Sequence, residues 1–416
     1  DDLSRGLGDV YKRQLVSRKV SVFLTILCVS LSIILFSSID NFRQSAKKTF
    51  FSNAKSGDLI ITSRSGEIES LLYLIFQIGT PTNNIRWKSF KDIQNHPDVK
   101  WAIPISLGDS HKQYRVLGTS SDYFKKIQIK NKKLEFYKGE HFKDIFDVVI
   151  GYDVAKTLNY KLNDKIIVAH GISSQDFHDE FPFRINGILK KLGTNTDKLI
   201  FVSLEALEAI HKDWQGGFKL PNVKSKSTSF NKSDLVPKEI TGAIIKLNSK
   251  IKIFQFKRDL HKYKSEPIQA IIPGLALTKL WQIVSFVEKI LFLICYFVIF
   301  ITLLGMAASI YTNVNQRNNE IALLRVVGAS PRSIFSILIL EGIIISLTSI
   351  LISILLMLLL NIILNPILDR EYGIYLEYNF LSAYNVIFYC SVVLISILVG
   401  LIPAYRGYKK SLNSGI

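Results

Sequence analysis

Histidine and carboxylate side chains gather in one short polar segment of this chain. Residues 169–181 read AHGISSQDFHDEF and contain five groups that can bind a cation: His170, Asp176, His178, Asp179 and Glu180. Imidazole nitrogens together with carboxylate oxygens are ligands that divalent transition metals accept. Metal binding is therefore one hypothesis for the segment. The spacing matches no standard metal motif and turn-forming residues dominate, so a solvated polar loop is the alternative.

Motifs for enzymatic chemistry are otherwise missing from the sequence. There is no G-x-x-x-x-G-K-[ST] phosphate loop, so we expect no ATP hydrolysis by the chain itself. There is also no H-E-x-x-H, no G-x-S-x-G and no pair of cysteines spaced for zinc. Cys28, Cys295 and Cys390 all lie within apolar runs and are interpreted as packing residues. A membrane-bound enzyme is accordingly the least favoured class, and no directly bound cofactor is expected.

A second segment, residues 316–331, reads QRNNEIALLRVVGASP. Polar residues open it, and residues 321–327 are predicted to form a short helix. Gly328 is suited to end that helix, because glycine adopts left-handed dihedral angles without a Cβ clash. Ser330 followed by Pro331 is typical of the N-cap and first turn of another helix. Because long apolar runs flank the segment, we expect it to lie across a membrane surface and join two spanning helices.

The pattern R-x-x-E-I-A-L-L-R-x-x-G-A-S in this segment resembles the signature of FtsX-like ABC transporter permeases, which include lipoprotein-releasing, macrolide-exporter (MacB) and cell-division permeases. The resemblance implies a coupling helix that docks on a separate cytoplasmic ATPase, which binds ATP and Mg²⁺. It also implies charged contacts from Glu320 and Arg325 and apolar contacts from Ile321 and Leu324. The positions that carry the resemblance are Arg317, Glu320, Ile321, Leu324, Arg325, Gly328, Ala329, Ser330 and Pro331. On pattern alone, an ordinary loop helix is the alternative.

Composition places the chain in a membrane. The 416 residues are 48% hydrophobic, and the apolar residues are concentrated in blocks. About 20 apolar residues in a helix cross a hydrocarbon core of about 30 Å. Four runs satisfy this length: residues 20–39, 289–311, 336–364 and 384–404. A secretory signal is the alternative for the first run, but no small-residue cleavage site follows it.

Two further helical stretches extend the first two spans. Residues 40–51 are predicted to continue the first helix as a stalk. Apolar residues at helical spacing predict a second stalk that packs on it: Leu277, Leu280, Trp281 and Val284. Asn365 and Pro366 are expected to end the third spanning helix, because proline disfavours a helical residue before it.

The part between the first two spans is polar and mixed. Strands are predicted at residues 58–63, 99–108, 114–120, 147–151, 165–171, 183–189, 198–204 and 239–247. Helices are predicted at residues 88–95, 121–127, 152–159 and 204–212. This alternation favours an α/β or α+β domain. Residues 147–168 and 183–210 resemble the periplasmic core domain of macrolide-exporter permeases, and residues 219–239 have the composition of a flexible loop.

These elements predict four transmembrane helices (one, then three) with a large extracytoplasmic α/β domain inserted between the first and the second. The corresponding parts are residues 15–51, 52–272 and 273–416. Residues 1–14 resemble translated adapter sequence and are left out of the fold expectation. Basic residues predict cytoplasmic termini, with the large domain on the opposite side of the membrane. Those on the cytoplasmic side are Arg18, Lys19, Arg317, Arg325, Arg332, Arg406, Lys409 and Lys410. The resemblance implies that this membrane is the bacterial inner membrane and that the large domain is periplasmic.

The formal net charge of +18 does not indicate a nucleic-acid partner, since no arginine-rich stripe or base-stacking motif accompanies it. A lysine-rich solvated surface explains the charge, with attraction to anionic lipid headgroups as the alternative. Glu341 lies within the third apolar run. An intramembrane coupling role and an interfacial, snorkelling side chain are both open for it. Gly305 with Ala308 and Ser309 predicts close helix packing, either inside one subunit or in a dimer.

The resemblance implies a permease subunit that couples ATP hydrolysis by the separate ATPase to mechanical motion of its outer domain, for export or extraction of a substrate. The alternative is a signalling subunit of the cell-division type, which activates a periplasmic partner without transport. The implied partners are the ATPase, a second permease subunit (the same chain or a paralogue), membrane lipid and a periplasmic adaptor or binding protein. The substrate stays open.

Overall fold

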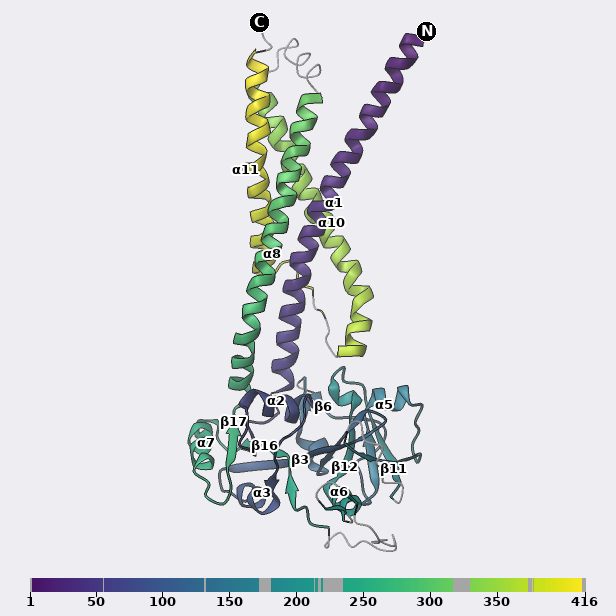
Figure 1. Ribbon diagram of the computed structural model, residues 1–416, viewed down its shortest axis with the longest axis vertical. Helices are drawn as coiled ribbons and strands as arrows, with labels where there is room; N and C mark the ends of the chain where they lie inside the picture. The colour runs from purple at the N-terminus through teal and green to yellow at the C-terminus, as the bar shows by residue number, and fades with distance from the viewer. Residues whose placement is uncertain are drawn as a thin grey trace. The chain divides into compact units, whose positions relative to one another are not determined.

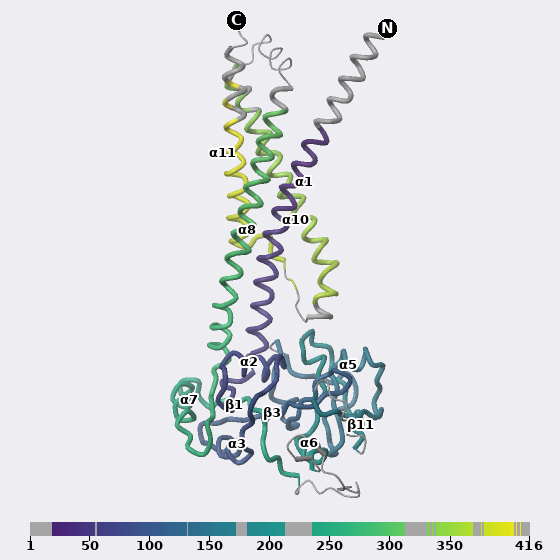
Figure 2. Tube along the Cα trace, viewed as in Figure 1, coloured from purple at the N-terminus to yellow at the C-terminus, as the bar shows by residue number. Residues whose placement is uncertain are grey.

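The computed structural model in Figure 1 describes residues 2–54, 56–130, 132–171, 181–212, 214–215, 218–219, 235–316, 330–372, 376 and 378–413. The chain divides into two compact units. The helical unit comprises Asp1–Ser45, Ser285–Pro366 and Leu376–Ile416, and the α/β unit comprises Ala46–Val284 and Ile367–Tyr375. Figure 2 traces the chain through both units.

Four long helices build the helical unit: α1 (Asp2–Asn53), α8 (Pro273–Gln316), α10 (Pro331–Tyr372) and α11 (Ala383–Asn413). Within the described residues these four are long and apolar enough to cross a membrane, at Lys19–Asn53, Pro273–Thr312, Leu338–Leu368 and Ala383–Ile402. Large apolar side chains point outward along them, such as Phe286 (67% exposed) and Ile387 (68% exposed). Exposed apolar surface of this extent suits a lipid environment, so the predicted membrane-spanning architecture is confirmed.

The four helices pack around a shared apolar core. Phe36 of α1 stacks on Phe388 of α11 with ring centroids 3.6 Å apart. Cys295 is buried in this core, whereas Cys28 and Cys390 are exposed on helix surfaces. The remaining core residues are Val29, Ile33, Ile299, Leu303, Met306, Ile310, Leu338, Ile345 and Val392. Buried serines also allow close approach of α1 to α10, where Ser30 Oγ donates to the Ser349 carbonyl at 3.1 Å.

Two helix ends differ from the sequence prediction. The helix α10 passes through Pro366 and ends at Tyr372, so the expected end at Asn365–Pro366 is wrong. Proline removes one backbone N–H from the helix but does not prevent the flanking turns from forming. Asn365 instead bonds its side chain to the backbone of Leu376 in both directions, at 2.8 and 3.1 Å. Helix α11 likewise continues to Asn413, beyond the predicted end at residue 404.

An 11-stranded mixed sheet forms the centre of the α/β unit among the described residues, in the order β17-β1-β16-β3-β4-β12-β8-β11-β7, with β10 on β3 and β9 on β11. Its strands are β1 (Leu59–Ser63), β3 (Val99–His111), β4 (Tyr114–Thr119), β7 (Phe136–Gly139), β8 (Asp147–Ile150), β9 (Lys165–Ile166), β10 (Ala169–His170), β11 (Phe183–Leu189), β12 (Ile200–Ser203), β16 (Gly242–Leu247) and β17 (Ile268–Ile271). The pairs β4/β12 and β8/β11 are parallel and the others antiparallel.

Short helices accompany the sheet: α2 (Glu67–Ile75), α3 (Trp87–Gln94), α4 (Asp122–Lys126), α5 (Tyr152–Thr157), α6 (Leu204–His211) and α7 (Ile253–His261). Two-residue strands and 3₁₀ turns complete the unit: β2 (Ile85–Arg86), β5 (Gln128–Ile129), β6 (Lys132–Lys133), β13 (Trp214–Gln215), β14 (Phe218–Lys219), β15 (Glu239–Ile240), η1 (Asn195–Lys198) and η3 (Lys250–Lys252). The predicted α/β domain is confirmed. The run at 165–171 forms two short strands, and the run at 198–204 begins in the 3₁₀ turn.

Both faces of the sheet are buried, which explains the continuous apolar runs in its strands. In β8, Val149 faces a core that includes α2, α4 and the first turns of α8, while Val148 and Ile150 face α5 and α6. Leu277 at the start of α8 is fully buried in the first of these cores. Trp281 contacts Phe50 of α1 with ring centroids 6.2 Å apart. The predicted packing of the second stalk on the first is therefore confirmed.

Candidate functional site

A cluster of one carboxylate and two imidazoles lies in the α/β unit, built by Asp109, His170 and His211. The first two come from adjacent strands, because β10 pairs with β3 and places His170 directly opposite Asp109. The Gly171 N–H also donates to the Gly108 carbonyl at 2.9 Å, which extends this pairing by one residue. Directly opposed residues on antiparallel strands hold their side chains within contact distance.

The third member, His211, reaches the strands from the last turn of α6. Ser203 is the N-cap of this helix, and its hydroxyl accepts the Ala206 N–H at 3.1 Å. Its apolar face is buried against the sheet through Leu204, Ala206, Leu207 and Ile210. Gly118 of β4 lies under Leu207 and, lacking a Cβ, leaves room for the helix to come close. The close packing of α6 sets the position of His211.

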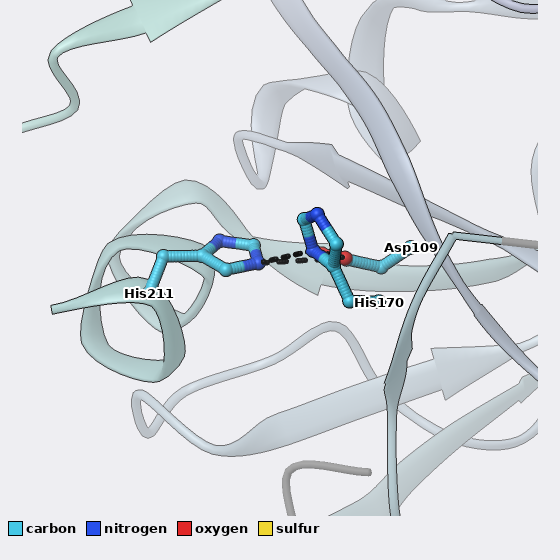
Figure 3. A group of neighbouring side chains, drawn as sticks. All are labelled: Asp109, His170 and His211. Carbon is cyan, nitrogen blue, oxygen red and sulfur yellow. Dashed lines mark hydrogen bonds and ion pairs between the residues drawn. The ribbon is translucent and has the colours of Figure 1, made fainter. Parts of the chain in front are cut away.

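Three ligand atoms meet in this cluster (Figure 3). His170 Nδ1 lies 3.2 Å from Asp109 Oδ1, and His211 Nε2 lies 3.4 Å from the same oxygen. The two imidazole nitrogens are 3.2 Å apart. The carboxylate is 4% exposed, whereas the His170 and His211 side chains are 38% and 29% exposed. The carboxylate of this cluster is therefore buried, and its two imidazoles are partly accessible to solvent.

The charge state of Asp109 follows from these neighbours. Burial raises its pKa, but the two imidazoles outweigh burial and lower the pKa to about 2. The carboxylate is therefore ionised at neutral pH and presents a negative oxygen to both rings. Beside it, a cavity of about 80 Å³ is lined by Asp109, Arg115 and Gly171 among others.

A further histidine, His111, lies two positions from Asp109 but is engaged elsewhere. Its Nδ1 lies 2.6 Å from the Ile167 carbonyl, and its Nε2 lies 2.9 Å from the Tyr160 hydroxyl. Burial lowers the pKa of His111, which favours the neutral ring. We interpret His111 as a structural residue that ties β3 to the segment before β10.

Of the three residues in this cluster, only His170 is a candidate ligand on the sequence alone. Asp176, His178, Asp179 and Glu180 lie outside the described residues. Asp109 and His211, which the structure does bring to His170, were missed. No local spacing connects them, because one residue belongs to β3 and the other to α6. The sequence shows only an aspartate after a predicted strand and a histidine in a predicted helix. Many proteins contain such residues without a metal site.

The coupling segment lies mostly outside the described residues, which end at Gln316 and resume at Ser330. The predicted sites Arg317, Glu320, Ile321, Leu324, Arg325, Gly328 and Ala329 are therefore not placed. Ser330 precedes α10, whose first residue is Pro331, so the predicted helix start is confirmed. Glu341 lies three turns into α10 and is half-buried. Next to it, a Cβ added at Gly342 would lie within 4 Å of Met306, Ile310 and Ser396.

Two family models match consecutive parts of the chain. The family model described as MacB-like periplasmic core domain matches residues 22–263, and the model described as FtsX-like permease C-terminal matches residues 292–412. No curated protein matches the chain.

Two solved structures are similar to the α/β region. The periplasmic region of MacB from Actinobacillus actinomycetemcomitans is 11% identical, with a TM-score of 0.35, over 56% of this chain and 97% of that one. The extracellular domain of the noncanonic ABC-type transporter YknZ from Gram-positive bacteria is 15% identical, with a TM-score of 0.31, over 51% of this chain and 98% of that one.

Proposed function

Because this chain belongs to the FtsX/MacB-type family of ABC transporter permeases, we propose that it is the membrane subunit of a complex powered by a separate cytoplasmic ATPase. ATP and Mg²⁺ bind that ATPase, and a second permease subunit completes the complex. The observation that carries the proposal is the arrangement of matches: the permease model covers three of the four spans and the core-domain model covers the inserted α/β domain.

Two continuous helices support a mechanical role for the α/β domain. Helices α1 and α8 both contain a membrane span and both contribute residues to the α/β unit. On the α8 side, Leu277 is buried in the domain core and Lys279 forms an ion pair with Glu67 of α2. Glu67 also holds Lys257 of α7 at 2.9 Å. Movement of α8 is therefore transmitted to α2 and α7. We propose that this motion of the α/β domain drives export or extraction of a substrate.

The coupling segment is proposed as the docking site of the ATPase, with Glu320 and Arg325 in charged contacts and Ile321 and Leu324 in apolar ones. The test is co-purification of a co-expressed ABC ATPase of this family with wild type and with Glu320→Arg. Wild type should retain the ATPase and show ATP hydrolysis that depends on the complex, and the charge reversal should weaken both. Glu135→Arg is the matched control, because Glu135 is an exposed glutamate of the α/β unit. A wild-type chain that retains no ATPase would contradict the proposal.

Glu341 is proposed to couple ATPase closure to helix movement within the membrane. It is half-buried in α10. Placing an ionisable side chain inside a membrane costs free energy, so such residues usually serve a function. Glu341→Gln should retain the bound ATPase but lower hydrolysis stimulated by the permease. Leu340→Ala is the control, since Leu340 is 54% exposed on the same helix. If Glu341→Gln and Leu340→Ala both stimulate ATP hydrolysis as strongly as wild type does, Glu341 is an interfacial residue without a coupling role.

The orientation is proposed as cytoplasmic termini with a periplasmic α/β domain, in the bacterial inner membrane. Labelling of single cysteines by an impermeant maleimide tests it. Ile251→Cys, at a position 92% exposed in the α/β unit, should react in intact spheroplasts. Lys19→Cys, at an exposed position before the first span, should react only after lysis. The opposite pattern would invert the orientation.

A further inference from the structure

We propose that Asp109, His170 and His211 bind a divalent transition-metal ion, zinc foremost, with water as the fourth ligand. The proposal concerns the α/β unit alone and holds whether or not the chain works with an ATPase. The three residues come from β3, β10 and α6, so a bound ion would join elements that are distant in the sequence.

The spacing of the three ligand atoms fits tetrahedral zinc. Zinc binds imidazole nitrogen and carboxylate oxygen at about 2.0–2.2 Å, and a tetrahedron with such bonds has ligand atoms about 3.3–3.6 Å apart. The observed separations are 3.2, 3.2 and 3.4 Å. The three atoms therefore mark one face of a tetrahedron of about this size. A fourth vertex toward the solvent would take a water molecule, as in zinc sites with three protein ligands.

The donor types select the class of ion. Two imidazoles with one carboxylate suit zinc and other late first-row metals, whereas calcium and magnesium take oxygen ligands. A buried carboxylate favours a cationic partner, because an uncompensated charge in the protein interior is costly. Asp109 is 4% exposed and lies in the strand, so it supplies that charge from a fixed position.

Convergence of all three atoms distinguishes a metal site from a hydrogen-bonded cluster. Without a metal, hydrogen bonds cannot satisfy all three contacts at once. If both rings donate an N–H to Asp109 Oδ1, the two N–H groups face each other, and if one ring donates to the other, the accepting nitrogen turns a lone pair toward the carboxylate. The His170 and His211 nitrogens are nevertheless as close to each other as His170 is to the carboxylate. A shared cation satisfies all three contacts at once, because it accepts a lone pair from each of the three atoms.

Direct metal titration tests the proposal on the full-length chain in detergent. The protein is stripped with a chelator and then titrated with Zn²⁺ in competition with a chromophoric chelator. Wild type should bind one Zn²⁺, and Asp109→Asn, His170→Ala and His211→Ala should each bind at least ~100-fold more weakly, since even residues that only support a ligand are worth 10–100-fold. His261→Ala is the matched control, because His261 is an exposed histidine of the same unit.

Thermal unfolding of the same samples separates loss of a ligand from loss of the fold. Each variant should melt cooperatively without zinc, and zinc should raise the melting temperature of wild type and His261→Ala only. A wild-type chain without zinc binding would overturn the proposal, as would unchanged binding by the His170→Ala/His211→Ala double variant. Loss of binding in His178→Ala with full retention in Asp109→Asn and His211→Ala would also overturn it, in favour of a site in the polar segment.

Discussion

Gly151 lies so close to the backbone of Asp197 that no side chain fits between them. A Cβ on Gly151 would be 2.3 Å from the Asp197 carbonyl oxygen and 2.6 Å from that of Thr196. The Gly151 N–H donates to the Leu199 carbonyl at 2.8 Å and fixes this approach. The first residues of α5 therefore pack directly against the 3₁₀ turn η1, which precedes β12.

Gly151→Ala should destabilise the α/β unit by about 2–3 kcal/mol, because the obstructing atoms belong to the backbone and cannot rotate away. Chemical unfolding of the full-length chain, followed by tryptophan fluorescence, measures the change. Gly274→Ala is the control, since Gly274 lies in the first turn of α8 with no atom within 4 Å of the added Cβ. It should be neutral or slightly stabilising. Equal stability of Gly151→Ala and wild type would contradict the observed approach.

Asp147 should make the α/β unit sensitive to acid. Burial opposes ionisation of Asp147, but the N–H groups of Asp144 and Lys143 and the Arg184 guanidinium outweigh it and lower its pKa. The donors lie 2.9, 3.0 and 2.7 Å from the carboxylate oxygens. Since the folded pKa lies below the unfolded one, the carboxylate stabilises the fold above about pH 4, and this contribution disappears as the pH falls further.

Asp147→Asn should therefore cost about 2 kcal/mol at pH 7, because two backbone N–H groups lose an anionic acceptor. The variant and wild type should converge in stability as the pH falls below about 4. Urea unfolding at several pH values measures both effects. Glu135→Gln removes an exposed pair with Lys190 and should change stability by less than about 1 kcal/mol. A constant difference at all pH values would show that the charge of Asp147 is not responsible.

The sequence predicts elements best where a pattern repeats over many residues. Apolar runs of about twenty residues predict the four spans, and residues 183–189 form the predicted strand without change. The short strand β17 and helices α2 and α7 were missed. Glu67–Ile75 and Ile253–His261 are short, and their burial depends on the sheet they pack against. Pro366 misled the prediction because the local rule for helix ends does not hold at this position, where the helix runs through the proline.

The candidate site is less predictable than the fold, since it is assembled by topology. His170 meets Asp109 because of a two-residue strand pairing. His211 joins them because α6 packs over Gly118. Neither the strand pairing nor the helix packing corresponds to a motif in the sequence around these residues. The fold had to be known before the three could be recognised as one group.

Buried charges in the helical unit give a further prediction. Arg43 Nη2 lies 2.8 Å from Asp40 Oδ1, and Arg43 Nη1 lies 3.9 Å from Glu288 of α8. The guanidinium also lies over the rings of Phe292 and Tyr384. Asp40→Asn removes the close anionic partner of Arg43, whose side chain is 25% exposed, and should cost about 2 kcal/mol, less than the loss of a partner by a fully buried charge.

Thermal stability of the detergent-purified chain measures this loss. The double variant Asp40→Asn/Arg43→Met should recover part of it, since both charges are then absent. Asp122→Asn is the control, because Asp122 and Lys126 form an exposed pair on α4. No recovery in the double variant would contradict the assignment of the cost to an unpaired Arg43.

The contact between α1 and α10 depends on small side chains and should not tolerate a large one. Ser349 is fully buried, and its hydroxyl donates to Ile345 at 2.7 Å and lies 3.3 Å from the Ile26 carbonyl. Ser349→Ala keeps the volume small and should cost less than about 1 kcal/mol, as for most hydrogen bonds between membrane helices.

Ser349→Leu should cost about 2–3 kcal/mol, because the added atoms must push α10 away from α1. Leu351→Ala is the matched control, since Leu351 is 59% exposed on the same helix and loses only outward-facing surface. Thermal unfolding in detergent ranks the three variants, and the expected order of stability is Leu351→Ala, Ser349→Ala, then Ser349→Leu. If leucine at position 349 is as stable as alanine, the two helices do not approach each other at this serine. Close packing at Ser349 would then not contribute to the stability of the contact between α1 and α10.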